Sequence, residues 1–135
     1  MNRREARETV FSLLYERNFQ MGETPELQYH QALELRELPD DTYMKEIYLG
    51  VIDKMEQLDE KIVANSGGWS IARMSKITRT ILRLSAYEML FRTDIPYNIS
   101  INEAVELAKK YEDEKAPAFV NGILNAIATK EGLKN

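Results

Sequence analysis

The chain has 135 residues, of which 44% are hydrophobic and 30% are charged, and its formal net charge is −4. This length and composition are typical of one soluble globular domain, spanning residues 1–135, that buries its own core. The lack of cysteine excludes a disulfide framework, thiolate chemistry and cysteine-type zinc sites, and no apolar run approaches the roughly 20 residues that span a bilayer. No apolar segment follows the basic residues at the start, so we predict no secretory signal and expect a cytoplasmic location.

Charge is unevenly distributed along the chain. The first seven residues hold Arg3, Arg4 and Arg7 against Glu5 alone, whereas much of the acidity lies in the segment 23–60. A small basic end on an acidic body permits local contact with RNA. On composition alone, a solvated helix terminus is the commoner explanation of such arginines.

The spacing of apolar residues predicts helices in the first half of the chain and no strand. A first helix is expected over residues 3–20, and Thr24 and Pro25 have the chemistry of a second helix start. That second helix should end before Pro39. A third and uninterrupted helix is expected after Asp41, because apolar residues then recur every three or four positions: Tyr43, Ile47, Val51, Met55, Leu58 and Ile62.

The second half continues in the same way after a glycine-containing turn at 65–68. A short helical segment is expected at 71–74, followed by a helix over 75–92 that Ser75 caps. The pattern from Ser100 to Glu103 is that of a capping box and predicts the start of the next helix. Pro117 should open the last one. We therefore expect an all-α, single-domain bundle of about seven helices.

No group of residues has the pattern of a catalytic or metal site. His30 is the single histidine and has no recognisable acid or nucleophile partner, so a surface histidine is expected. Glu103 and Glu106 are spaced as surface charges of a helix. There is no phosphate-binding or dinucleotide-binding glycine motif. We predict a protein without enzymatic activity, cofactor or metal.

One face of the first expected helix has a composition suited to RNA. At 100° per residue, Arg4, Arg7, Phe11 and Tyr15 fall within one arc beside the core stripe. Arginines neutralise phosphates, and aromatic rings stack on the bases of single-stranded RNA. Alternatively, the two aromatic residues widen the core face and the arginines are solvated, and spacing alone does not decide between these readings.

Several motifs resemble those of one known family. They are INEAVELAKKY at 101–111, FVNGIL at 119–124, ILRL at 81–84, Tyr87-Glu88, and Ile-Pro-Tyr at 95–97. In their order along the chain they are similar to the NusB family of bacterial transcription antitermination factors, and the arginine-rich start also resembles the opening helix of that family. The segment from about residue 21 to residue 41 carries no such signal.

The resemblance implies a non-enzymatic protein that binds boxA, a short single-stranded element of nascent RNA. Arg83 also matches a family position, although a partly buried salt bridge would explain it equally well. The run from Lys115 to Ala118 departs from the family pattern, which puts some polar RNA contacts in doubt. With Phe11 from the helical arc, the predicted RNA-binding residues are Arg3, Arg4, Arg7, Phe11, Tyr15, Arg83, Phe119 and Asn121.

The resemblance also implies a protein partner, the ribosomal protein NusE, within an antitermination complex on RNA polymerase, with ribosomal RNA operons as expected targets. The predicted partner contacts are Thr78, Glu88, Asp94 and Tyr97, and Thr78 departs from an acidic residue common in the family. Two alternatives remain open. The chain could be a homodimeric interaction module whose interface hides the arginines, or a detached form of the domain that is fused to RNA cytosine methyltransferases.

Overall fold

A computed structural model describes residues 1–19 and 22–134. Within these ranges the chain is helical without a strand, which confirms the predicted all-α fold. None of the described helices combines the length and the apolar character that a membrane span requires. Gln20, the predicted last residue of the first helix, lies outside the described residues. The elements are α1 (Arg3–Arg17), α2 (Pro25–Arg36), α3 (Thr42–Asp53), α4 (Met55–Ala64), the 3-10 helix η1 (Ile71–Arg73), α5 (Lys76–Phe91), α6 (Tyr97–Tyr111) and α7 (Ala116–Lys130).

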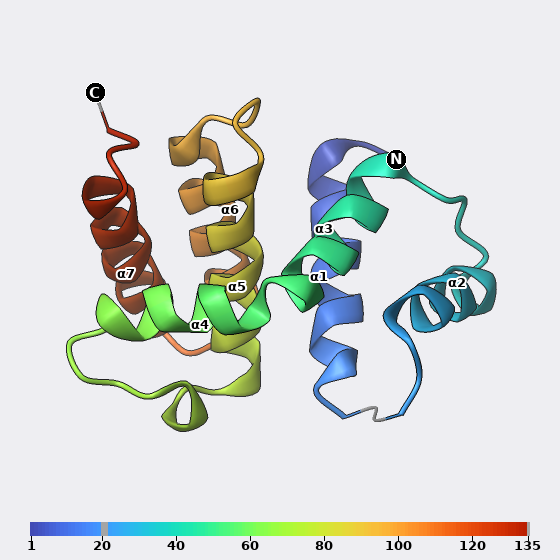
Figure 1. The fold of residues 1–135 in the computed structure, drawn as a ribbon, viewed down its shortest axis with the longest axis horizontal. Coiled ribbons are helices and arrows are strands. Elements are labelled where there is room, and N and C mark those ends of the chain that lie inside the picture. The colour runs from blue at the N-terminus through green and yellow to red at the C-terminus, as the bar shows by residue number, and fades with distance from the viewer. Residues whose placement is uncertain (20–21, 135) are drawn as a thin grey trace.

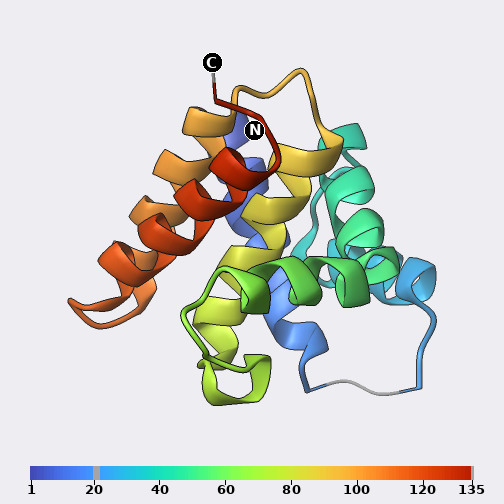
Figure 2. The ribbon, with the colours of Figure 1, turned by 60° about the vertical axis from the view of Figure 1, so that its left-hand side comes forward.

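Helix α5 is the centre of the fold (Figure 1). It packs against α1 and α3 on one side and against α4, α6 and α7 on the other, whereas α2 contacts mainly α3. Ten of its sixteen residues are buried. Figure 2 shows α6 and α7 lying side by side, with the 3-10 segment below the start of α5. A helix so enclosed offers little of its own surface to a partner.

Local sequence explains where several helices begin. At α1, the Asn2 side chain accepts from the Glu5 amide at 2.8 Å, and the Glu5 carboxylate accepts from the Asn2 amide at 3.2 Å. This reciprocal capping box holds the first turn of α1. Ser75 caps α5 by accepting from the Thr78 amide at 3.0 Å, as predicted.

The predicted third helix is in fact two helices. The apolar stripe that begins at Tyr43 is continuous in sequence, but the backbone leaves helical geometry at Lys54, with φ −100° and ψ 12°. Both halves of the stripe pack against α5, but their other partners differ at this residue, since α3 also packs against α1 and α2 whereas α4 also packs against α7. The helical period continues across the break, so spacing alone did not reveal it.

The predicted helix start at Ser100 is also wrong. Helix α6 begins at Tyr97, directly after Pro96, so Ser100 lies inside its first turn. Ser100 is buried, and its carbonyl accepts a hydrogen bond of 3.0 Å from the Ser85 hydroxyl on α5. Glu103 is consequently not part of a capping box and is available for a contact with another helix.

Candidate nucleic-acid interface

The groove between α1 and α6 brings together charged side chains of both helices. Arg4 projects from the first turn of α1, and its guanidinium lies 3.0 Å from the Glu103 carboxylate. One turn further on, Glu8 accepts hydrogen bonds from Lys110 at 2.6 Å and from the Tyr111 hydroxyl at 2.8 Å. Arg4 keeps 73% of its side-chain surface exposed in this pair, so the cation remains accessible to an anion.

These contacts fix the charge state of the groove. The hydrogen bond from Lys110 lowers the pKa of Glu8, and the same pair raises the pKa of Lys110. The hydrogen bond to Glu8 raises the pKa of the Tyr111 hydroxyl, and the contact with Glu103 raises that of Arg4. At neutral pH the groove therefore holds full charges of both signs, neutralised in pairs.

Beside this groove runs a continuous series of aromatic rings, the aromatic track, formed by Tyr111, Phe11, Tyr15 and Phe19. Successive ring centroids are 5.2, 6.5 and 5.3 Å apart. A lysine ammonium lies over each end of the track, Lys110 at 5.4 Å from the Tyr111 ring and Lys76 at 5.6 Å from the Phe19 ring. Rings for stacking next to cations for phosphate are the features with which proteins hold single-stranded nucleic acid.

Within the track the rings differ in exposure. Phe11 is buried at 4% and belongs to the core, so the prediction that it contacts RNA directly is not supported by its position. Tyr15 is partly exposed, while Tyr111 and Phe19 expose 39% and 60% of their surfaces. Phe11 therefore packs in the core beneath the neighbouring rings. This position matches the alternative reading of the sequence, in which the aromatic residues of the first helix widen the core face.

Arg7 is not in the exposed position that the helical arc predicted. It is 3% exposed, and its guanidinium pairs with the Glu88 carboxylate of α5, with Nε and Nη2 each 3.0 Å from Oε2. The Tyr43 hydroxyl donates to the same carboxylate. Arg7 lies on the side of the arc that faces α5. A helical wheel of α1 alone does not show which neighbouring helix covers a residue, so it could not distinguish the exposure of Arg7 from that of Arg4.

The same network removes Glu88 from the predicted partner surface. Glu88 is 0% exposed, and its buried charge is balanced by Arg7 and by the Tyr43 hydroxyl. Burial, together with the negative charge of Glu88, raises the pKa of Tyr43. Glu88 therefore fixes α5 to α1 and α3, and the prediction that it meets a basic partner is wrong.

The Tyr43 ring links the buried network to the surface. The exposed Arg3 guanidinium lies 4.2 Å from the ring centroid, and the Arg92 guanidinium lies 5.7 Å from it. Arg92 in turn donates to Asp94 at 2.8 and 2.9 Å, and this hydrogen bonding lowers the pKa of Asp94 to about 2. Asp94 is exposed but already has an internal cation.

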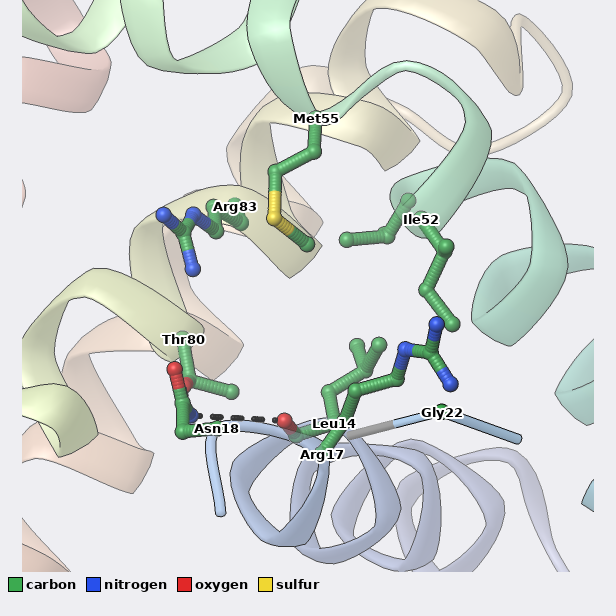
Figure 3. Close-up of a pocket in the computed structure, with 9 residues that line it drawn as sticks. Leu14, Arg17, Asn18, Gly22, Ile52, Met55, Thr80 and Arg83 are labelled. Atoms are coloured by element: carbon green, nitrogen blue, oxygen red, sulfur yellow. Dashed lines mark hydrogen bonds between the residues drawn. The ribbon is translucent and has the colours of Figure 1, made fainter. Parts of the chain in front are cut away.

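Arg83 lies in a different part of the molecule from Arg4. It faces α4 and makes two hydrogen bonds to Asp59, at 2.7 and 2.9 Å, with only 11% of its side chain exposed. The alternative of a partly buried salt bridge therefore describes its position. Figure 3 shows Arg83 and Arg17 on the walls of a pocket of about 360 Å³ between α1, α5 and the junction of α3 with α4. Arg17 is also held internally, by Gln28 and by the Glu23 carbonyl.

The other predicted residues fall at the start of α7 and around the ends of α5 and α6. Phe119 is partly exposed and its ring meets Trp69 edge-on, with centroids 5.8 Å apart. Asn121 is exposed and accepts from the side-chain amide of Asn125 at 3.1 Å.

Thr78 is buried and its hydroxyl donates to Glu112 at 3.3 Å, so it is not the open partner contact that was predicted. Tyr97 begins α6 and packs partly against the core.

The single histidine and the acidic residues of the described chain form no metal-ligand cluster. His30 is exposed, as predicted for a surface histidine, and its ring meets the neighbouring Tyr29 ring edge-on. No cluster of three potential metal ligands occurs in residues 1–19 and 22–134. The geometry defines a helical binding protein with an exposed aromatic and cationic edge.

Sequence reasoning missed several residues of that edge. Lys110, Tyr111, Phe19 and Lys76 were not predicted as contacts, although a lysine pair followed directly by tyrosine was visible in the motif at 101–111. The position of Phe19 beside Lys76 joins the end of α1 to the start of α5, 57 residues later. Only the tertiary structure shows that contact.

Comparison with known proteins assigns the family. The NusB family pattern matches residues 4–129. The chain is 47% identical, over 95% of its length and 89% of the relative, to the transcription antitermination protein NusB of Ruminiclostridium cellulolyticum. The chain belongs to the NusB family, and this membership confirms the predicted non-enzymatic character.

Solved structures agree with this assignment. The chain is similar to T. maritima NusB with a TM-score of 0.84 and 35% identity, covering 96% of this chain and 92% of the other. It is also similar, with a TM-score of 0.82 and 31% identity, to a chain in a crystal structure of the antitermination factors NusB and NusE with double-stranded RNA, covering 95% of this chain and 96% of that one.

Proposed function

We propose that this protein is a cytoplasmic transcription antitermination factor that acts as a single binding domain and assembles RNA and a protein partner without chemistry. Its RNA target is a boxA-type single-stranded element, and its partner is the ribosomal protein NusE in a complex with RNA polymerase. Ribosomal RNA operons are the expected targets. Family membership and the similar chain in a complex with NusE and RNA support this proposal.

The observation that carries the RNA part is the aromatic track with a lysine over each end. Exposed rings supply stacking surfaces that tolerate any base, and Lys110 and Lys76 supply cations for the backbone. Arg4 lies in the groove next to the track. Of the predicted contacts, the exposed or partly exposed residues Arg3, Arg4, Tyr15, Phe119 and Asn121 remain in the proposed interface.

NusE fits the charge of the protein. With a net charge of −4, a few exposed cations attract phosphates only locally, so a second protein that adds positive charge would extend the RNA interface. Asp94 and Tyr97 are the predicted contacts that remain accessible for it. Tight RNA binding should therefore require both proteins.

The test is fluorescence anisotropy of a labelled boxA-type RNA, titrated with this protein alone and with equimolar NusE. A scrambled RNA and a duplex of the same sequence serve as competitors, because the similar complex contains double-stranded RNA. Arg4→Ala should weaken binding and reduce the slope of log K against log salt by about one. The matched control is Arg36→Ala, which removes another partly exposed arginine from an ion pair, between α2 and Glu16.

Sequence-selective binding that tightens with NusE and weakens only in Arg4→Ala supports the proposal. Equal affinity for the scrambled RNA, with and without NusE, would contradict it. Equal losses in Arg4→Ala and Arg36→Ala would mean that general charge, rather than the groove between α1 and α6, governs binding. A preference for the duplex would contradict the single-stranded target.

A further inference from the structure

A second aromatic site lies where the segment before α5 meets the turn between α6 and α7. It is a pocket of about 440 Å³, lined by residues of the 69–75 segment and by Glu112, Asp113, Lys115 and Phe119. Trp69, the single tryptophan of the chain, is 42% exposed at this site although it contacts the Phe119 ring. An indole left so open at the edge of a pocket is available for stacking.

Side chains of both charge signs line this pocket. The Arg73 guanidinium lies 5.0 Å from the Trp69 ring centroid, and Lys115 adds a second cation. Asp113 accepts from the backbone amides of Lys115 and Ala116, at 3.0 and 3.1 Å, just before and at the start of α7, while Glu112 accepts from the Thr78 hydroxyl. The carboxylates disfavour a phosphate among them, whereas the Arg73 guanidinium at the indole favours one nearby.

Residues that line the pocket are close in sequence to both ends of the aromatic track. Ser75 lines the pocket, and the next residue, Lys76, lies over Phe19 at one end of the track. At the other end Lys110 lies over Tyr111, and Glu112, two residues later, lines the pocket. The pocket and the track therefore use neighbouring residues of the same two segments, 75–76 and 110–112.

We propose that this pocket takes one unpaired nucleobase of the bound RNA, which packs on Trp69 while Arg73 contacts the adjoining phosphate. This inference rests on the proposed function and extends it from the predicted contact Phe119 to Trp69 and Arg73, which the sequence analysis did not select. A flat, uncharged base matches an aromatic wall and is not repelled by carboxylates, and the guanidinium beside the indole suits the phosphate that follows it. Stacking needs no particular base, so the pocket adds affinity more than sequence preference.

The single tryptophan makes a direct test possible. RNA is titrated into the protein in the presence of NusE, and the emission of Trp69 is followed beside the anisotropy of the RNA. A matched blank that contains NusE and RNA without this protein is subtracted. A base on the indole should quench its emission with the same midpoint as the anisotropy curve. Trp69→Ala should weaken RNA binding about ten-fold, the order of one base–aromatic stack, whereas Trp69→Phe should stay within about three-fold of the wild type.

A matched control comes from another exposed aromatic residue with a cation. Phe91 is 36% exposed at the end of α5, with Lys54 at 5.8 Å from its ring. Phe91→Ala should leave RNA affinity unchanged. Arg73→Gln should weaken binding and reduce the salt slope by about one. A series of RNAs with one abasic nucleotide each should include one position at which quenching is lost, which tests the pocket without any change to the protein.

The outcomes separate this inference from the proposed function. If Arg4→Ala weakens RNA binding while Trp69 is not quenched and Trp69→Ala binds normally, the nucleobase pocket is wrong and the proposed function stands. If no RNA binds under any condition, the proposed function itself fails. Quenching by NusE in the absence of RNA, with no further change on adding RNA, would make the pocket a protein contact and overturn the inference.

Discussion

Arg4 and Arg7 lie one turn apart on α1 and have opposite environments. Both pair with a glutamate of a neighbouring helix, at 3.0 Å in each case, but the Arg4 side chain is 73% exposed and the Arg7 side chain 4%. Arg7 has a second shared partner in Tyr43, which donates to Glu88, whereas Arg4 contacts Glu103 at the rim of a groove. Both residues are arginines of the same motif. Their different burial makes Arg7 part of a structural ion pair and leaves Arg4 as a cation that a ligand can reach.

This difference shows how one helix serves two purposes. Removing either partner of a buried pair leaves an uncompensated charge in the core, whereas an exposed pair is screened by water and contributes little to stability. The exposed arginine can exchange its glutamate for a phosphate because little folding free energy depends on it. The buried pair holds α1 against α5 and thereby fixes the position of the exposed residues.

The largest effect should come from breaking the buried pair. Arg7→Ala or Glu88→Ala should lower the free energy of unfolding by about 3–5 kcal/mol, because each leaves one charge unpaired in the core. Urea unfolding followed by circular dichroism measures the change. The double variant Arg7→Met/Glu88→Gln removes both charges and keeps a polar partner for Tyr43, so it should recover most of the loss.

RNA binding sharpens the same comparison. The folded double variant Arg7→Met/Glu88→Gln should bind RNA as the wild type does, while Arg4→Ala weakens binding with little change in unfolding. A double variant that is stable but has lost RNA binding would show that Arg7 contacts RNA after all, and the contrast between the two arginines would collapse.

An intermediate effect is expected at Arg83, which is neither fully buried nor free. Arg83→Ala removes two hydrogen bonds to Asp59 at a site with 11% side-chain exposure and should lower the free energy of unfolding by about 1–2 kcal/mol. RNA affinity should not change. Arg83→Met, which keeps the packing of the aliphatic chain, separates lost packing from lost charge. A fall in RNA affinity without a fall in stability would restore Arg83 to the RNA interface.

The helical fold could be predicted from sequence because apolar spacing, Ser75 as a cap and Pro117 in the first turn of α7 are local signals. The break at Lys54 and the true start of α6 could not, because tertiary packing set the first and Pro96 took precedence over the serine at position 100. At the site, a helical wheel placed Arg4 and Arg7 in one arc, but the exposure of each depends on which helix covers it. Trp69 and Phe119 are 50 residues apart, so only the folded chain brings them together.

The smallest change, at Glu103, gives the most direct measure of how available Arg4 is. Glu103→Gln removes the carboxylate that holds Arg4, at 3.0 Å, and a negative charge from the groove that RNA would enter. Glu103 keeps 16% of its side chain exposed and Arg4 keeps 73%, so the free energy of unfolding should change far less than in Arg7→Ala. RNA affinity should rise about two- to five-fold at low salt and return toward the wild type as salt screens the charge. Glu106→Gln, a neighbouring exposed glutamate on the same helix that pairs with Lys109, is the matched control and should change affinity less. If Glu103→Gln binds RNA more weakly instead, the Glu103 carboxylate orients Arg4 toward the phosphate rather than competing with it. The pair of Arg4 with Glu103 would then have a positioning role, as the buried pair of Arg7 with Glu88 has.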